Sequence, residues 1–104
     1  MKKVYDYTCQ VCGIRLEAVG VPYAEGGHIK GLGEPHNGSD SIDNMIILCP
    51  NDHHIFDAYG FSINDDFTLI GKEGSLLMKS NHNINIDNIR YHREKYKLAH
   101  KGVL

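Results

Sequence analysis

Residues 26–63 read GGHIKGLGEPHNGSDSIDNMIILCPNDHHIFDAYGFSI, and the changes of composition along this stretch predict the fold. Residues 30–43 are dense in Gly, Pro, Ser, Asn and Asp, which is typical of a loop. The apolar run at residues 45–49 predicts a short buried strand, and Pro50, tolerated in a first helical turn, indicates a short helix after it. Because strand-like residues precede the loop and end near His28, the predicted order is strand, loop, strand and helix.

Three cysteines and a histidine are spaced as in structural zinc sites. Cys9 and Cys12 lie three positions apart, as on a zinc knuckle, and Cys49 and His53 lie four apart where strand should run into helix. His54 is an alternative fourth ligand, pointing about 100° round the helix from its neighbour. Buried thiols or a redox pair would explain Cys9 and Cys12 alone but leave the second half-site without a role. The sequence therefore predicts zinc ligation by Cys9, Cys12, Cys49 and His53.

Three further polar residues are candidates for chemistry. His28 follows two glycines and precedes the polar loop, so its imidazole can face open space and accept a proton from water near neutral pH. Taken alone, such a histidine is more often exposed or structurally hydrogen-bonded. Asn44 precedes the apolar run, where its side chain can ligate a metal, hold a loop in place or serve as an ordinary turn residue. Asp57, one turn beyond His53, can face a catalytic divalent ion or end the helix.

The composition is that of a small globular protein. The chain has 104 residues, 41% of them hydrophobic and 23% charged, which predicts one domain and argues against disorder. A small core with many loops is commonly stabilised by disulfide bonds or a structural metal ion, and an odd number of cysteines favours zinc over disulfides. No apolar signal-like segment follows Met1, and no run approaches the roughly 18 apolar residues of a membrane span. We therefore expect a cytoplasmic protein with reduced cysteines.

The charge is unevenly distributed. A net charge of −2 is unlike that of a strongly basic nucleic-acid binder. Basic residues nevertheless gather near the C-terminus: Arg90, Arg93, Lys95, Lys97 and Lys101. The helix predicted there is equally compatible with a phosphate-contacting surface and with a solvated face that keeps the protein soluble.

The order of these motifs resembles a known family. A C-x-x-C pair, His-Ile, an Asn before an apolar strand and then Leu-Cys-Pro-Asn-x-His resembles the HNH endonucleases, which have the ββα-metal fold. Residues 26–63 look like the HNH domain at the C-terminus of SRA-HNH modification-dependent restriction enzymes, and YHREKY at residues 91–96 is similar to the same subgroup. We accordingly expect an α+β fold in one domain, residues 1–104, with a zinc knuckle at 5–13, a ββα-metal core at about 18–58, a hairpin at about 61–78 and a C-terminal helix at about 88–100.

The resemblance assigns roles residue by residue. It implies that His28 is the general base, that Asn44 binds metal or orients the catalytic loop, and that His53 is the last histidine of the motif. The residues matching the family's zinc thiolates are Cys9, Cys12 and Cys49. Structural Zn²⁺ and a catalytic Mg²⁺ or Mn²⁺ are the implied cofactors.

Two positions depart from the family pattern. Gly27 stands where many HNH enzymes place a metal-binding Asp or His before the base, and Asp52 stands at the place of the usual fourth zinc Cys. His53 is therefore left to serve either zinc or the catalytic ion. Further candidates for the catalytic ion are His36, Asp40, His54 and Asp57.

The resemblance implies a metal-dependent DNA endonuclease of the restriction-modification type, in which His28 activates water and one divalent ion stabilises the leaving oxygen. Double-stranded DNA is the expected partner, and target choice would come from DNA structure, a homodimer or a separate target-recognition protein. The alternative is a non-catalytic zinc-binding module for nucleic acid or protein, which gives His28 and Asn44 no role. A redox protein using the C-x-x-C pair gives none to Cys49 and His53.

Overall fold

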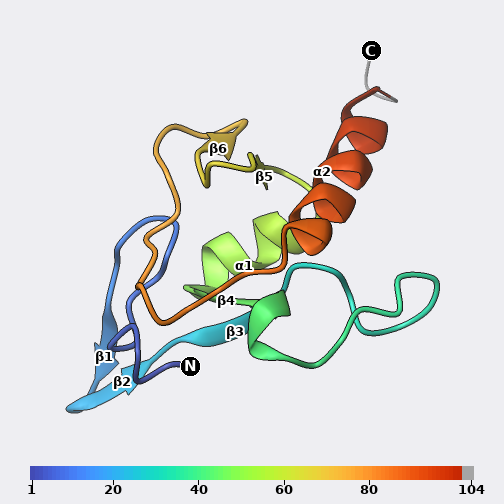
Figure 1. Ribbon diagram of the computed structural model, residues 1–104. Coiled ribbons are helices and arrows are strands. Elements are labelled where there is room, and N and C mark those ends of the chain that lie inside the picture. The colour runs from blue at the N-terminus through green and yellow to red at the C-terminus, as the bar shows by residue number, and fades with distance from the viewer. Residues whose placement is uncertain (102–104) are drawn as a thin grey trace.

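The computed structural model describes residues 1–101, and a ββα unit lies at its centre (Figure 1). Its elements are β3 (Glu25–His28), the 3-10 helix η1 (Ile42–Asn44), β4 (Met45–Leu48) and α1 (Pro50–Asp57). β3 and β4 pair antiparallel, and the loop of residues 29–44 departs from the end of the pair where His28 lies. The fold is α+β, as the sequence predicts.

The start and end of α1 follow from local chemistry. The sulfur of Cys49 caps the helix by accepting a hydrogen bond from the Asp52 N–H at 3.5 Å, and Pro50 occupies the first turn, where no N–H is needed. The chain leaves the helix through Gly60, where a Cβ would stand 2.4 Å from the Ile55 side chain. A residue with a side chain would clash with Ile55 here, so the end of α1 requires glycine at this position.

The apolar residues of β4 supply the centre of the core. Ile46, Ile47 and Leu48 are fully buried. Ile46 and Leu48 belong to a cluster with side chains of the C-terminal half, whereas Ile47 packs against Tyr5 and Ala24. Core therefore covers both faces of this strand, which is why its sequence is a continuous apolar run rather than an alternation.

One buried side chain holds loop 29–44. The Oδ1 of Asn44 accepts a hydrogen bond from the Lys30 N–H at 2.8 Å, and its Nδ2 donates to the carbonyls of Lys30 and Ser39, each at 2.8 Å. Gly38 passes so close that a Cβ there would stand 2.1 Å from the Lys30 carbonyl oxygen. Asn44 thereby ties the two ends of the loop together immediately after β3.

A hairpin precedes the ββα unit. It consists of β1 (Leu16–Ala18) and β2 (Val21–Tyr23), which pair antiparallel. Val19 and Gly20 between them both have positive φ, at 54° and 75°. Two such residues form the turn whose twist matches that of the flanking strands.

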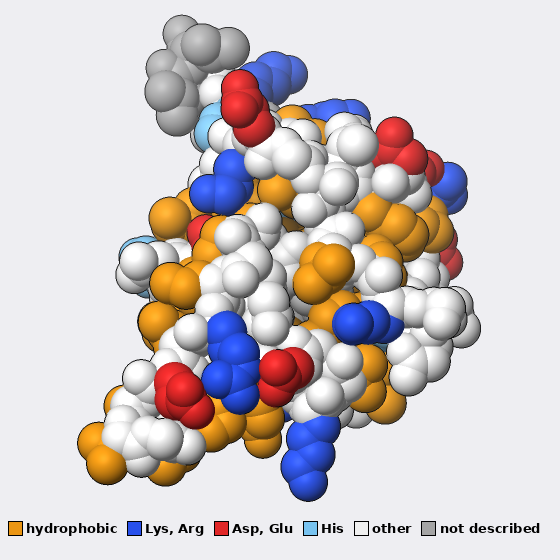
Figure 2. Space-filling view, turned by 90° about the vertical axis from the view of Figure 1, so that its left-hand side faces the viewer, with side chains coloured by type: hydrophobic (Ala, Val, Ile, Leu, Met, Phe, Trp, Pro, Cys, Tyr) orange, Lys and Arg blue, Asp and Glu red, His pale blue; other side chains and the backbone are white. Residues whose placement is uncertain are grey.

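The surface near this hairpin carries mixed charge. Arg15 lies between two acids, 3.3 Å from Asp6 and 3.6 Å from Glu17. Figure 2 shows one face of the molecule, on which basic and acidic side chains are interspersed. No broad basic surface covers this face.

The C-terminal half of the chain packs against the ββα unit and completes the hydrophobic core. β5 (Ser62–Ile63) and β6 (Leu69–Ile70) form a short antiparallel pair, and α2 (Ile86–Lys101) packs against β5. The fully buried Ile89 brings α2 into the main cluster. Within residues 1–101, neither α1 nor α2 combines the length and apolar character that crossing a membrane requires.

His92 joins α2 to the centre through a buried imidazole. Its exposed fraction is 3%, and its ring stacks on Phe56 with centroids 3.8 Å apart. Nε2 lies 3.0 Å from the Phe56 carbonyl oxygen and Nδ1 lies 2.8 Å from the Ser62 hydroxyl. Because a carbonyl only accepts, Nε2 carries the proton. Burial lowers the pKa of His92 to about 4, outweighing the hydrogen bond to Phe56, so the ring is neutral near pH 7.

The pH dependence of stability should reflect this group. In the unfolded chain His92 has its ordinary pKa of 6.5, so only the unfolded state takes up the proton as pH falls toward 4. The stability that His92 contributes is present above pH 6.5 and is lost, by on the order of 3 kcal/mol, as pH falls to about 4. Urea unfolding at several pH values in this window should show a smaller loss for His92→Gln than for the wild type. The exposed His54→Gln is the control and should follow the wild type; equal losses in all three proteins would contradict the assignment.

Candidate active site and metal centre

Three thiols and one carboxylate converge where the N-terminal turns meet the start of α1. The sulfurs of Cys9, Cys12 and Cys49 and a carboxylate oxygen of Asp52 all lie within 4.8 Å of one another. Cys12 Sγ is 3.7 Å from Cys49 Sγ, and Asp52 Oδ2 is 3.3 Å from Cys9 Sγ and 3.4 Å from Cys49 Sγ. In the part of the chain that the structure describes, no other three such side chains gather as closely.

These separations fit a tetrahedral zinc ion. With Zn–S near 2.3 Å and Zn–O near 2.0 Å, tetrahedral angles separate two sulfurs by about 3.8 Å and a sulfur from an oxygen by about 3.5 Å. The sulfur–sulfur distance of 3.7 Å and the sulfur–oxygen distances of 3.3 and 3.4 Å lie close to these values. Four protein donors leave no open position for substrate, so the cluster has the character of a structural site.

The geometry brings Asp52, and not His53, to the three thiols. Consecutive helical residues point about 100° apart, so the side chain of His53 leaves the cluster for the neighbouring face of α1. The predicted zinc ligand set therefore differs from the observed cluster at this one position. A spacing signal existed, because Cys49 and Asp52 are three positions apart, as are Cys9 and Cys12.

Burial governs the electrostatics of the cluster. It raises the pKa of Cys12 to about 12, and it also raises the pKa of Cys49. For Asp52, burial opposes ionisation, but hydrogen bonds from the three thiols and the charge of Lys72, whose Nζ lies 3.7 Å from Oδ1, lower the pKa below its ordinary value. The Asp52 carboxylate is thus ionised beside the protonated thiols of Cys12 and Cys49, and a metal ion binding here would displace thiol protons.

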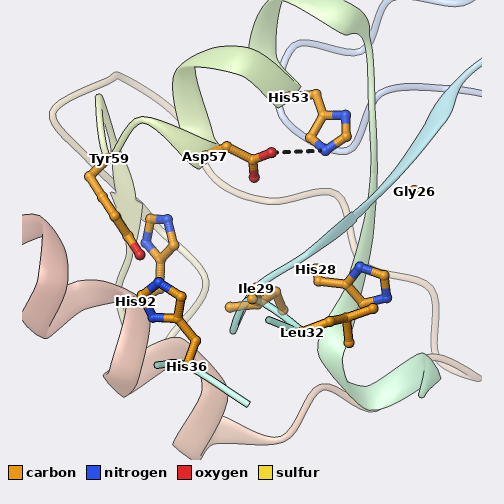
Figure 3. Close-up of a pocket in the computed structure, with 10 residues that line it drawn as sticks. Gly26, His28, Ile29, Leu32, His36, His53, Asp57, Tyr59 and His92 are labelled. Atoms are coloured by element: carbon orange, nitrogen blue, oxygen red, sulfur yellow. Dashed lines mark ion pairs between the residues drawn. The ribbon is translucent and has the colours of Figure 1, made fainter. Parts of the chain in front are cut away.

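A cleft of about 400 Å³ borders the face of α1 that carries His53 (Figure 3). Its histidine and acidic lining consists of His28, His36, His53, His92 and Asp57, and Tyr59 adds a phenol. In Figure 3, His53 and Asp57 project from α1, and His28 lies at the end of β3. The two histidines that the sequence singled out for catalysis therefore line the same cleft.

Carboxylates contact both ring nitrogens of His53. Nδ1 lies 2.8 Å from Glu25 Oε1, and Nε2 lies 3.2 Å from Asp57 Oδ2. The hydrogen bond from the Tyr23 hydroxyl, and next that with His53, lower the pKa of Glu25. An ionised Glu25 only accepts, so Nδ1 carries the proton, and Nε2, which faces the Asp57 carboxylate, can offer its lone pair to a cation bound between the two groups. This nitrogen and the Asp57 carboxylate form a two-donor site for a divalent ion.

Glu25 has no sequence signal of its own. It precedes the Gly-Gly-His motif, and its role arises only because β3 lies against α1. The contact is close: a Cβ at Gly27 would stand 2.9 Å from Leu48 Cδ1 and 3.4 Å from His53 Nε2. Backbone, and no side chain, therefore occupies this position beside the imidazole.

Asp40 orients His28. Its Oδ1 lies 2.9 Å from His28 Nε2, and the side chain of Asp40 is 73% exposed. An ionised carboxylate can only accept, so Nε2 carries the proton and Nδ1 is the proton-accepting nitrogen of the neutral ring. The side chain of His28 is 24% exposed, which allows water to reach it. This arrangement suits a general base.

Asn44 lies outside the cleft. Its oxygen and its amide nitrogen are used by Lys30 and Ser39, and the side chain is fully buried. Of the roles open to it from sequence, these contacts favour holding the loop over ligating a metal. His54 is exposed and does not line the cleft, whereas His36 does, with Nδ1 bonded to the Tyr91 hydroxyl.

Comparison with known proteins places these residues in one family. Residues 9–64 match the family model described as HNH endonuclease. Among solved structures, the modification-dependent restriction endonuclease TagI is similar to this chain, with 42% sequence identity and a TM-score of 0.86. The match covers 90% of this chain and 35% of the TagI chain, so this chain spans about a third of the length of that relative. A search of curated proteins found no match.

The matched stretch contains all four residues of the cysteine–aspartate cluster and the cleft residues of β3 and α1. The chain therefore belongs to the HNH endonuclease family.

Substitutions on adjacent residues of α1 should separate the two sites. Asp52→Ala removes one of the four candidate zinc donors, and we expect zinc affinity to fall more than about tenfold, since even outer-shell partners are worth about 10–100-fold. Cys12→Ser should lose zinc likewise and unfold at lower temperature. His53→Ala should retain one zinc per chain. Mass spectrometry after dialysis measures the zinc bound to each variant. Loss of zinc from His53→Ala and its retention by Asp52→Ala would show that His53, as predicted from the sequence, is the fourth ligand.

Proposed function

We propose that this chain is a metal-dependent endonuclease that hydrolyses phosphodiester bonds of DNA. The observation that carries the proposal is the pairing of His28 with Asp40 at the edge of a cleft that also exposes His53 and Asp57. A proton acceptor and a two-donor site for a divalent ion then face one space. Membership of the HNH endonuclease family supports the same reaction class.

His28 acts as the general base. Nδ1 accepts a proton from water while the water oxygen bonds to phosphorus, and the bond from phosphorus to the 3′ oxygen breaks. The leaving 3′ oxygen acquires a proton from solvent, which gives a 5′-phosphate and a 3′-hydroxyl. Asp40 accepts from Nε2–H and favours the imidazolium that forms on His28, since the charges then lie side by side.

His53 and Asp57 would hold the catalytic divalent ion. The site fits because His53 Nε2 and Asp57 Oδ2 lie 3.2 Å apart in the cleft, where a divalent ion between them would be bound by both atoms, with positions left for water and phosphate. When bound, Mg²⁺ or Mn²⁺ would supply positive charge to the phosphate and the leaving oxygen. Glu25 acts through His53, because its hydrogen bond to Nδ1 sets the tautomer that presents Nε2.

The cluster of Cys9, Cys12, Cys49 and Asp52 would hold structural zinc. It lies at the start of α1, the same helix that presents His53 and Asp57. Zinc bound there would connect the N-terminal turns to α1 and stabilise the orientation of the helix.

Double-stranded DNA is the proposed substrate. The name of TagI describes a restriction endonuclease that depends on modification, and this chain matches about a third of it. We assign cleavage to the matched part, with target choice supplied by a homodimer or by a separate target-recognition protein. Each cleft would cut one strand at a time.

Replacing the base should abolish cleavage while leaving the fold intact. We expect His28→Ala to cut plasmid DNA at least about 10²-fold more slowly than wild type with Mg²⁺ or Mn²⁺, because proton transfer by a positioned base is worth about 10²–10⁴-fold. Its zinc content should be unchanged. His54→Ala, which removes an exposed histidine of α1, is the matched control and should cut normally. Full activity of His28→Ala would show that His28 is not the general base. A wild-type protein that carries zinc but cuts no DNA would favour the alternative function, a non-catalytic binding module.

The affinity for Mn²⁺ tests whether Glu25 positions His53 for metal binding. Glu25→Gln weakens the acceptor of the His53 Nδ1–H bond, and we expect Mn²⁺ affinity to fall about tenfold, as for other outer-shell partners. Calorimetric titration of the zinc-loaded protein with Mn²⁺ measures this directly. Glu17→Gln, on β1, is the control and should bind Mn²⁺ as wild type does. Unchanged affinity in Glu25→Gln would exclude the positioning role.

A further inference from the structure

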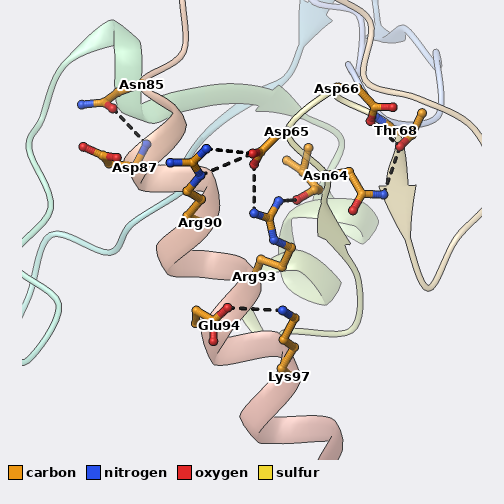
Figure 4. Close-up of polar contacts among 11 residues, drawn as sticks. Asn64, Asp65, Asp66, Thr68, Asn85, Asp87, Arg90, Arg93, Glu94 and Lys97 are labelled. Carbon is orange, nitrogen blue, oxygen red and sulfur yellow. Dashed lines mark hydrogen bonds and ion pairs between the residues drawn. The ribbon is translucent and has the colours of Figure 1, made fainter.

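The basic residues of α2 do not form a continuous positive surface. Figure 4 shows Arg90 and Arg93 converging on Asp65, at distances of 3.0 and 2.9 Å. Lys97 pairs with Glu94 at 3.3 Å. Three of the five basic side chains that the sequence places near the C-terminus are therefore neutralised within the protein. Lys101 lies at the end of α2, and Lys95 lies beside loop 29–44, which makes Lys95 the candidate for a partner bound near the cleft.

Lys95 shares an aromatic ring with a lysine from loop 29–44. The ammonium of Lys30 lies 4.7 Å from the centroid of the Tyr91 ring, and that of Lys95 lies 5.5 Å from it. Both distances fall within the range of a cation–aromatic interaction. Among residues 1–101, neither ammonium takes part in an ion pair with a carboxylate.

Two positive charges at one ring favour an anion. Both ammonium groups lie within 5.5 Å of the same ring centroid, so their positive charges add in this region and attract an anion. The ring and the loop hold both side chains half-buried, so less conformational freedom is lost on binding than for free surface lysines. The Tyr91 hydroxyl is bonded to His36 Nδ1, and the lysines lie against the ring. A base would therefore find the aromatic face occupied, whereas a phosphate would find two donors.

This lysine pair lies at the edge of the cleft. Lys30 stands between Ile29 and Gly31, which both line the cleft. On the other side, Tyr91 contacts the cleft residue His36 and precedes the cleft residue His92. A strand whose scissile phosphate lay beside His28 would leave the cleft over this edge.

We propose that Lys30 and Lys95, held by Tyr91, bind a backbone phosphate of duplex DNA next to the phosphate that is cleaved. The proposal rests on the proposed endonuclease function and adds a substrate-binding surface to it. Because the donors contact phosphate and no base edge, this contact is independent of sequence. It makes binding salt-dependent, since each phosphate contact releases condensed counterions.

The test is DNA binding as a function of salt. Fluorescence anisotropy of a short labelled duplex, with zinc-loaded protein and no added Mg²⁺ or Mn²⁺, gives the dissociation constant between about 50 and 200 mM NaCl. Lys30→Gln and Lys95→Gln keep side-chain length and remove the charge. Because the two lysines share one phosphate, each substitution should lower the slope of log affinity against log salt by up to about 0.9 and weaken binding by up to about eightfold at 0.1 M NaCl. Lys97→Gln, on the same helix but paired with Glu94, is the matched control and should change neither quantity.

The possible outcomes separate this surface from the catalytic proposal. Equal affinities and slopes for wild type, Lys30→Gln and Lys95→Gln, with wild-type cleavage present, would overturn the surface and leave the nuclease. Slower cleavage with unchanged binding, or lower melting temperature with unchanged binding, would likewise overturn it. A wild type that neither binds nor cuts DNA would remove both proposals. Loss of binding and of salt slope in the two variants, with normal zinc content and no change in Lys97→Gln, supports it.

Discussion

The buried amide of Asn44 is the contact on which the arrangement of the cleft depends. Its three hydrogen bonds of 2.8 Å close loop 29–44, and this loop returns Asp40 to the imidazole of His28. A buried polar group left without a partner costs about 1–3 kcal/mol, so the loop has one strongly preferred conformation. The same closure places Lys30 beside the cleft. Asn44 therefore serves the proposed reaction through the backbone, without reaching the substrate.

Helix α1 connects the two proposed metal sites. Asp52 faces the three thiols and His53 faces the cleft, because consecutive helical residues point in directions about 100° apart. The helix is capped by the sulfur of Cys49, which is itself part of the cluster. Any change in the orientation of α1 would move both donor sets. This coupling gives a structural metal a direct effect on the geometry of the cleft.

A net charge of −2 is compatible with the proposed binding of DNA, because the local distribution of charge matters more than its total. Asp65 neutralises Arg90 and Arg93, so much of the basic character near the C-terminus stabilises the contact of α2 with the β5–β6 hairpin. Lys30 and Lys95 instead come together from distant parts of the chain. A count of basic residues along α2 overstates its positive surface and misses the contribution of the loop.

The sequence by itself determined the order of strand, loop, strand and helix at the centre, and it identified His28 and the three thiols as chemically special. The order of elements is confirmed, because composition and turn residues act over a few neighbouring residues, whereas the roles of His28 and the thiols stay predictions. Only the tertiary structure showed which residues meet: Asp52 with the thiols, Glu25 and Asp57 with His53, Asp40 with His28, and Tyr91 with both Lys30 and Lys95. Most of these partners are distant in the chain. They meet through the rotation of α1, the packing of β3 against it and the closure of loop 29–44, and each of these depends on the burial of side chains that local sequence patterns do not encode.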